Sequence, residues 1–470
     1  MATSPNDVIN SPAIRSLIWM YAALLILEGV LRKWLLPSIS DPLLLVRDPF
    51  LVLIYLIALG NGAFPLNGHV GALLVIGTVA GIAGMTVGSQ DPIVTAYGFD
   101  CMFFHLPLIF VIPKVMTREH VIDIGRFLFL ITLPMAALMA VQFRSPPDAL
   151  INCGAGGGIG SQMGGALGKI RPPGFFTFIT GAAHFLALST AFLIFGLWKK
   201  GIYSRVLLLG VGVSIAVAAI VSTSRLALGA IGTVFLMIGI IVALDRRSMS
   251  NVMGMLVPIG IVMVVATNLD IFHEGREVFE ARLQNTNDAA VGIAGTASNW
   301  TARIFGNFYG GFAAIKDAPA LGAGLGVGTN VGARVLSGQF GFLLAEGEWP
   351  RVVLELGPFL AMPYLLIRCL ICVTLYIEAA RSARNGNVLP MLLFGSCALL
   401  VTIGQFSQTS TLGFAVLGAG LCLASANLTR ENIPAVPKSG EPEENGPSPR
   451  TKQRGCSAYA EKLHDYKTVG

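Results

Sequence analysis

The sequence predicts an all-α, polytopic integral membrane protein with about twelve transmembrane helices. Of its 470 residues, 54% are hydrophobic and 12% are charged, and the charged share is about half that of an ordinary soluble domain. Apolar runs of about 17 to 25 residues recur along the chain, which is the length a helix needs to cross a hydrocarbon layer of about 30 Å. A water-soluble fold is therefore not expected.

The apolar runs define twelve expected spans, with edges placed to within a few residues. They cover 14–31, 43–60, 70–87, 99–115, 121–141, 174–197, 203–221, 225–244, 251–267, 352–376, 388–404 and 409–426. Pro107, Pro113 and Asp123 interrupt the pair at 99–141, because proline breaks a helix and a charge is costly in lipid. An even number of crossings places both termini on the same side.

Lys and Arg residues in the short loops predict the orientation. The side shared with the termini carries Lys114, Arg118, Lys199, Lys200, Arg205, Arg246, Arg247, Arg381 and Arg384. The opposite side carries the smaller set Arg32, Lys33, Arg144, Lys169, Arg171 and Arg225. Because positive loops stay in the cytoplasm, we expect both termini there. The net charge of +6 follows from this bias, and no nucleic-acid partner is expected.

Two loops on the outer side are long. The first, at about 142–173, contains GAGGGIGSQMGGALG, whose glycines indicate a mobile or closely packed backbone. The second, at about 268–351, is predicted to hold amphipathic helices around 272–283 and 300–315, followed by GAGLGVGTNVG. Residues 1–430 are thus expected to form the transmembrane domain, and 431–470, rich in Pro, Gly, Glu and Lys, a disordered cytoplasmic tail.

The glycine runs match no nucleotide-binding template. Ile170 follows Gly168 and Lys169 where a P-loop requires Ser or Thr. The later run, which begins at Gly322, has period two and misses the third position of GxGxxG. The seven cysteines show no paired spacing, so neither disulfides nor a zinc site is predicted. We expect no cofactor and no metal.

Arg171 and Arg225 are the candidate anion-binding residues of the outer side. Arg225 begins a helix, where the dipole disfavours a cation, so a bound anion would make physical sense; reaching the lipid headgroups is the alternative role. Arg171 lies in RPPGFF, and an interfacial anchor is its alternative role. Glu28 and Arg32 are expected to pair, and His105 is expected to be packed and hydrogen-bonded.

The stretch AEGEWPRVVLELGP concentrates charged residues where a helix begins. They are Glu346, Glu348, Arg351 and Glu355. A capped helix start with a local ion pair is the simpler interpretation, because acidic residues favour the first helical turn. Glu355 lies deeper, where a carboxylate must be paired or functional.

Four motifs taken in order resemble one family. RPPGFF, STSRLALGAI, PALGAGLGVGTN and EWPRVVLELGPF, spread over roughly residues 140 to 365, resemble the superfamily of O-antigen ligases and O-antigen polymerases, which are bacterial envelope glycan enzymes. The resemblance implies an inner-membrane protein of about twelve helices. It also implies a periplasmic cavity that receives a glycan carried on undecaprenyl pyrophosphate.

The resemblance implies roles for individual residues. Arginines matching Arg171 and Arg225 bind the donor pyrophosphate in that family. The family's His-Asn pair is absent here and Glu346 or Glu348 stands in its place, which favours a polymerase over a ligase. We therefore take Glu348, Glu346 and Arg351 as candidate catalytic residues, with either glutamate as general base. Guanidinium groups stabilise a pyrophosphate leaving group, so the scheme is metal-independent.

The implied partners are a lipid-linked glycan donor, a glycan or lipid acceptor, membrane lipids and other envelope polysaccharide assembly proteins. A secondary transporter or lipid-glycan flippase is the main alternative, because twelve helices is also a common transporter count. The arginines at the outer boundary and the outer loop of about 80 residues count against it. A non-catalytic scaffold is a further alternative, and it would tolerate the loss of Arg171 and Arg225.

Overall fold

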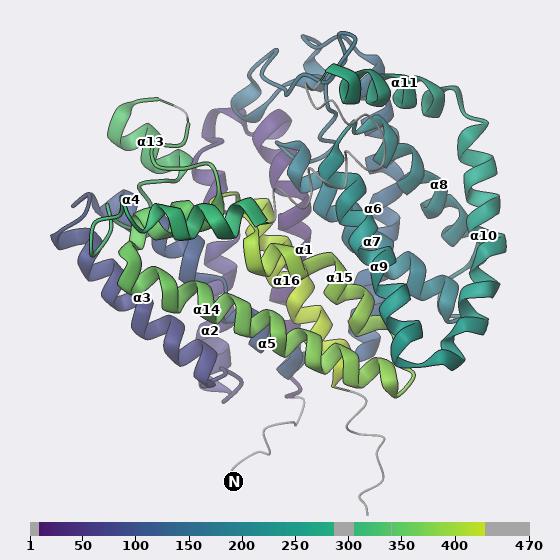
Figure 1. Cartoon of the computed structure of the whole chain (residues 1–470). Helices are drawn as coiled ribbons and strands as arrows, with labels where there is room; N and C mark the ends of the chain where they lie inside the picture. Colours follow the sequence, from purple (N-terminus) through teal and green to yellow (C-terminus); the bar gives the residue numbers. More distant parts are fainter. Residues whose placement is uncertain (1–8, 286–304, 340, 428–470) are drawn as a thin grey trace, which may run out of the picture. The chain divides into compact units, whose positions relative to one another are not determined.

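A computed structural model describes residues 9–285, 305–339 and 341–427 (Figure 1). Over these residues the protein is helical, and one isolated antiparallel bridge joins Gly164 to Ile170. The all-α prediction is confirmed for this part of the chain. The predicted tail at 431–470 lies outside the described residues.

The helices follow one another with short connections except on two long segments. They are α1 (Pro12–Val30), α2 (Asp48–Gly60), α3 (Gly68–Thr86), α4 (Pro92–Phe99), α5 (Leu108–Val115), α6 (Arg118–Arg144), α7 (Ile179–Trp198), α8 (Arg205–Val221), α9 (Arg225–Leu244), α10 (Met249–Thr267), α11 (Asp270–Asn285), α13 (Asn330–Ser337), α14 (Glu348–Arg384), α15 (Leu389–Ile403) and α16 (Thr409–Ala426). Residues 305–314 are also helical. Both amphipathic segments expected in the second long loop are therefore helical where they are described.

Nine helical segments among the described residues are long and apolar enough to cross a membrane. The pair α4 and α5, bent by 44°, would make a tenth span, and α8 and α15 are shorter apolar helices. Each of the twelve predicted spans contains helical residues. Length and composition support a polytopic membrane protein with about nine long apolar helices, and the count of twelve is left as a prediction.

Two predicted helix starts need correction. The span expected from 174 begins only at Ile179. The two prolines of RPPGFF are followed by a turn at Gly174, whose φ is 60°, and Phe178 is still extended, with φ −132° and ψ 153°. The helix expected from 352 begins at Glu348, since Pro350 is tolerated in the first turn of a helix. This α14 changes direction at Gly357, whose φ of 71° is not helical.

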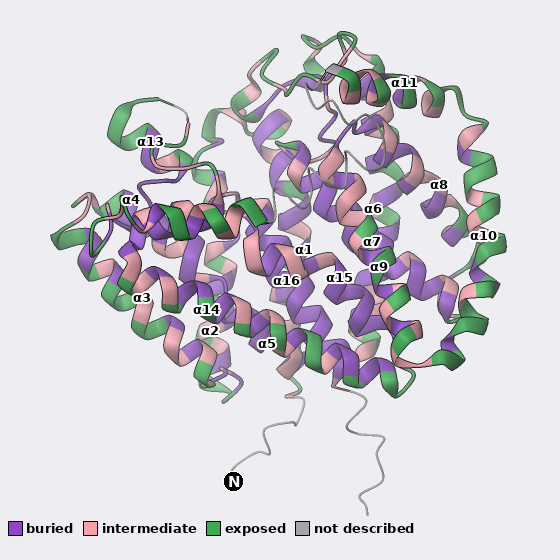
Figure 2. Cartoon of the chain, viewed as in Figure 1, coloured by how far each residue is buried: buried purple, intermediate pink, exposed green. Residues whose placement is uncertain are grey.

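The burial pattern separates central helices from peripheral ones (Figure 2). The share of buried residues in an apolar 18-residue stretch is 89% for α7 and 83% for α16. For the segment that contains α10 the same share is 11%. Exposed side chains on α10 are large and apolar, including Met253, Val257 and Val264. Such a surface is stable in lipid and costly in water.

The two described ends of the chain meet at the same place. The Ile9 amide donates to the Lys114 carbonyl at 2.7 Å, and the Asn427 side-chain amide donates to the Pro113 carbonyl at 2.9 Å. We call this end of the helices the terminal face. The opposite end, where α1 ends and α16 begins, is called the cavity face.

Candidate functional site

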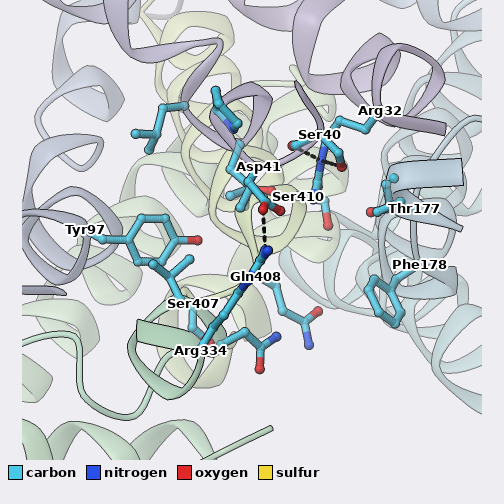
Figure 3. Close-up of a pocket in the computed structure, with 18 of the residues that line it drawn as sticks. Arg32, Ser40, Asp41, Tyr97, Thr177, Phe178, Arg334, Ser407, Gln408 and Ser410 are labelled. Carbon is cyan, nitrogen blue, oxygen red and sulfur yellow. Dashed lines mark hydrogen bonds and ion pairs between the residues drawn. The ribbon is translucent and has the colours of Figure 1, made fainter. Parts of the chain in front are cut away.

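A large cavity of about 1710 Å³ opens on the cavity face. Its wall comes from the segment after α1, from α4 and the turn that follows it, from the first turns of α7 and α16, from the loop 154–163, and from α13 (Figure 3). Leu45, Phe99 and Phe178 give it apolar surface, while serine, threonine and glutamine side chains give it hydrogen-bonding groups. Such a mixed wall suits an amphipathic ligand that carries hydroxyl groups.

The two arginines of the cavity wall are each held by neighbouring groups. Arg32 donates from Nε to the Ser40 carbonyl at 2.9 Å and from Nη1 to Glu28 at 3.2 Å, which confirms the predicted pairing of Glu28 with Arg32. Arg334 forms an ion pair with Asp41 across the cavity (Figure 3). Four carboxylates also line the wall, and they are Asp41, Asp48, Asp100 and Glu346.

The glycine-rich run after Pro319 serves close packing between backbones. The amides of Gly326 and Gly328 donate to the Glu355 carboxylate at 3.2 and 2.8 Å. A Cβ atom on Gly326 would lie 2.1 Å from the Val94 carbonyl oxygen of α4. This packing fixes Thr329, whose side chain caps α13, and so brings Arg334 to the cavity wall.

Glu348 and Arg351 lie in a closed ion cluster, which we call the buried cluster: Glu348, Arg351, Glu355 and Arg368. Their side chains are 0–1% exposed. Arg351 binds Glu348 at 2.8 Å and Glu355 at 2.9 Å, and Arg368 binds Glu348 at 2.6 Å. Two arginines balance two glutamates. Burial of charge at this depth is tolerated only with such pairing and hydrogen bonding.

Arg368 completes the buried cluster and was missed by the sequence analysis. It donates to the carbonyls of Val401 and Gly404 at 2.8 and 2.9 Å, at the end of α15, and stacks on Phe406 with 3.8 Å to the ring centre. A single arginine inside an apolar helix was the available signal, because such a charge requires a partner. Neither Glu348 nor Arg351 lines the cavity, whereas the exposed Glu346 does.

Arg171 and Arg225 lie on neighbouring segments of the cavity face. The Arg171 amide donates to the Met163 carbonyl at 2.9 Å, and Met163 lines the cavity. Arg225 follows the turn at 222–224, and a Cβ atom on Gly165 would lie 3.3 Å from the Thr223 hydroxyl oxygen. The segment 163–171 and this turn are thus in contact, although neither arginine lines the cavity itself.

A third arginine, Arg282, reaches the same turn from α11. Its guanidinium donates to the Thr223 carbonyl. Thr223 is fully buried with φ 45°, a strained conformation for a β-branched residue. Backbone strain of this kind gathers at binding and catalytic sites. Sequence reasoning missed Arg282 because an arginine on an amphipathic helix is usually solvated.

An exposed ion pair joins α11 to the end of α6. Arg144 donates to both oxygens of Glu274, at 2.6 and 3.2 Å. This hydrogen-bonded guanidinium holds the pKa of Glu274 below its ordinary value. Because both side chains are exposed, the pair positions α11 and adds little stability.

The prediction that His105 is packed and hydrogen-bonded is confirmed. His105 is buried, and its Nδ1 lies 2.9 Å from the Tyr21 hydroxyl. His105, Asp48 and Asp100 each offer one atom that could bind a metal ion, and these three atoms lie within 4.8 Å of one another.

No family model and no curated protein matches this chain.

Proposed function

We propose that this protein is a glycosyltransferase of the O-antigen ligase and polymerase type, acting outside the cytoplasm on glycans carried by undecaprenyl pyrophosphate. The observation that carries the proposal is the amphipathic cavity on the cavity face, with arginine-bearing segments beside it. An isoprenoid chain needs apolar walls, a glycan needs hydroxyl and amide partners, and a pyrophosphate needs cations. The order of the sequence motifs supports the same assignment.

Arg171 and Arg225 are assigned to the donor pyrophosphate, with Arg282 as a third cation at the same turn. As the bond between sugar and pyrophosphate breaks, negative charge gathers on the leaving group. Guanidinium forks stabilise this charge through paired hydrogen bonds. The proposed chemistry therefore needs no metal. The group that accepts the proton of the attacking hydroxyl is assigned to one of the carboxylates that line the cavity. Glu346 is one of them, and Glu348 is not.

We further propose twelve crossings in a bacterial inner membrane, with both termini in the cytoplasm. An even number of crossings is supported by the ends of the described part of the chain, because Ile9 and Asn427 both bind the end of α5. The excess of Lys and Arg in the loops of the terminal face supports the orientation. The cavity face then opens to the periplasm, where glycan acceptors are available.

Arg225→Ala in the native host is expected to stop glycan assembly while the protein still reaches the membrane. Loss of one such charge-stabilising donor lowers turnover on the order of 10²-fold, so single undecaprenyl-linked units should accumulate at the outer leaflet. Gel analysis of lipid-linked glycans measures this. Arg126→Ala is the matched control, because Arg126 is exposed on α6 and forms a local ion pair with Asp123.

Two other outcomes of the Arg225 experiment contradict the proposal in different ways. Glycans of normal length would remove the role of Arg225 in catalysis. Units trapped at the inner leaflet would instead indicate a flippase.

A further inference from the structure

A second group of buried charges differs from the buried cluster because it opens to the cavity. Asp48 and Asp100 line the cavity, and their side chains are 18% and 15% exposed. His105 lies behind them at 1% exposure, and its Nε2 atom is 3.2 Å from one oxygen of each carboxylate. Two carboxylates therefore lie against one imidazole nitrogen at the cavity wall.

Hydrogen-bond directions assign the tautomer of His105. Arg47 donates from Nη1 to the Tyr21 hydroxyl oxygen at 3.2 Å, and arginine can only donate. The Tyr21 hydroxyl is then free to donate its hydrogen to His105 Nδ1, 2.9 Å away, which favours the tautomer without a proton on Nδ1. In this neutral tautomer the proton sits on Nε2, on the side of the two carboxylates, and can be donated to one of them at a time.

The net charge of this group depends on the protonation of His105, and a protonated imidazole balances it. Glu28 lies 3.2 Å from Arg32 and 3.7 Å from Arg47, so two cations face three carboxylates once Asp48 and Asp100 are included. With a neutral imidazole, one negative charge is left, and the carboxylates at the cavity wall carry it. The buried cluster, in contrast, is balanced and closed. Ionisable groups at membrane depth that line a cavity indicate function, and Asp48 and Asp100 do so.

The local backbone also favours a functional role. Asp100 begins a π-helical turn, Asp100–Phe104, between α4 and α5, where the span bends by 44°. Arg32 lies in the other π-helical turn of the described chain, Leu31–Leu35. Both turns supply residues to the cavity wall. Such turns are frequent at functional sites, and irregular backbone at membrane depth occurs where it lines a cavity.

We propose that Asp48 and Asp100 form the general base of the transfer reaction, a statement that rests on the proposed function. A hydroxyl group of the acceptor glycan gives its proton to one of these carboxylates. The acceptor oxygen forms a bond to the anomeric carbon of the donor sugar. The bond from that carbon to the pyrophosphate oxygen breaks, and its electron pair leaves with the lipid pyrophosphate.

His105 and Tyr21 are positioning residues in this scheme, because they reach the reaction only through the carboxylates. His105→Gln can retain an N–H donor toward the carboxylates, whereas His105→Leu cannot. We expect the glutamine variant to retain clearly more transfer than the leucine variant. Equal loss in both, with both folded, would show that His105 only fills space.

The test compares Asp48→Asn and Asp100→Asn with Asp123→Asn, a matched change at an exposed site on α6. Transfer is followed from a lipid-linked glycan donor with the purified full chain, and binding is followed with farnesyl pyrophosphate. We expect each cavity variant to lower transfer on the order of 10²- to 10⁴-fold while farnesyl pyrophosphate binding and thermal unfolding are unchanged. Should Asp100→Asn not fold, Asp100→Glu keeps the carboxylate and Asp48→Asn still decides.

Three results would overturn the proposal. The first is unchanged transfer in both folded variants. The second is loss of transfer in Glu346→Gln with transfer retained in both aspartate variants. The third is stoichiometric Mn²⁺ binding by the wild type that both variants lose, which would make the group a metal site. A wild type that neither binds farnesyl pyrophosphate nor transfers glycan would instead overturn the proposed function.

Discussion

Arg368→Ala is expected to lower the free energy of unfolding by about 3–5 kcal/mol, the cost of breaking a buried ion pair from one side. The change leaves the Glu348 carboxylate with Arg351 as its one remaining cation, in a site that is 1% exposed. It also removes the donors to the carbonyls of Val401 and Gly404 at the end of α15. Denaturant titration in detergent micelles measures the loss.

Arg381→Ala is the matched control for Arg368→Ala. Both arginines lie on α14, but Arg381 is 62% exposed and pairs with Glu378 three residues before it. An exposed pair contributes about 0–1 kcal/mol, so this variant should unfold almost like the wild type. Equal effects of the two substitutions would contradict the structural role of the buried cluster.

Gly326→Ala is expected to have the second large effect. The residue has φ +88°, and an added Cβ would lie 2.1 Å from the Val94 carbonyl oxygen. The left-handed conformation costs roughly 1–3 kcal/mol for a residue with a side chain, and the overlap costs roughly 1–3 kcal/mol more. Because the loop also binds Glu355 and positions α13, the shape of the cavity should change as well.

Thermal unfolding and farnesyl pyrophosphate binding measure the two consequences of Gly326→Ala. Gly239→Ala on α9 is the control, because a Cβ there meets nothing within 4 Å and alanine favours a helix by about 1 kcal/mol over glycine. The control should be neutral or slightly stabilising. A Gly326 variant with wild-type stability would show that the loop does not pack against α4 as described.

The helices could be predicted from the sequence because hydrophobic length is a strong signal in a membrane protein. The first residue of each helix was harder to predict from the sequence. The late start of α7 at Ile179 follows a pair of prolines, and the early start of α14 at Glu348 depends on one proline that its first turn tolerates. The span that was hardest to predict is the one that is broken in the middle. The bend between α4 and α5 interrupts the apolar run at residues that line the cavity.

The candidate site was predicted only in part. Loop position was enough to place Arg171 and Arg225 on one face, because sidedness follows from the order of the spans. Glu346 and Glu348 are two residues apart, yet one lines the cavity and the other enters the buried cluster. Where the helix begins decides this difference, and the sequence does not fix that point.

The carboxylates at the cavity wall were out of reach for a different reason. Asp100 and His105 lie at the two ends of one π-helical turn in the broken span, but Asp48, at the start of α2, meets them only through packing. The glycines at 322–328 were equally ambiguous, because close backbone packing and phosphate binding both require glycine. The surrounding helices distinguish the two uses.

The central claim is that cations beside the cavity hold a lipid pyrophosphate, and ligand binding tests it most directly. Saturable binding of farnesyl pyrophosphate to the purified chain is predicted, with much weaker binding of farnesol. In Arg171→Ala/Arg225→Ala the affinity should fall about 10- to 100-fold per guanidinium removed, as expected for hydrogen bonds to a charged group. Equal affinity of the double variant and the wild type, or equal binding of farnesol and farnesyl pyrophosphate, would contradict the claim.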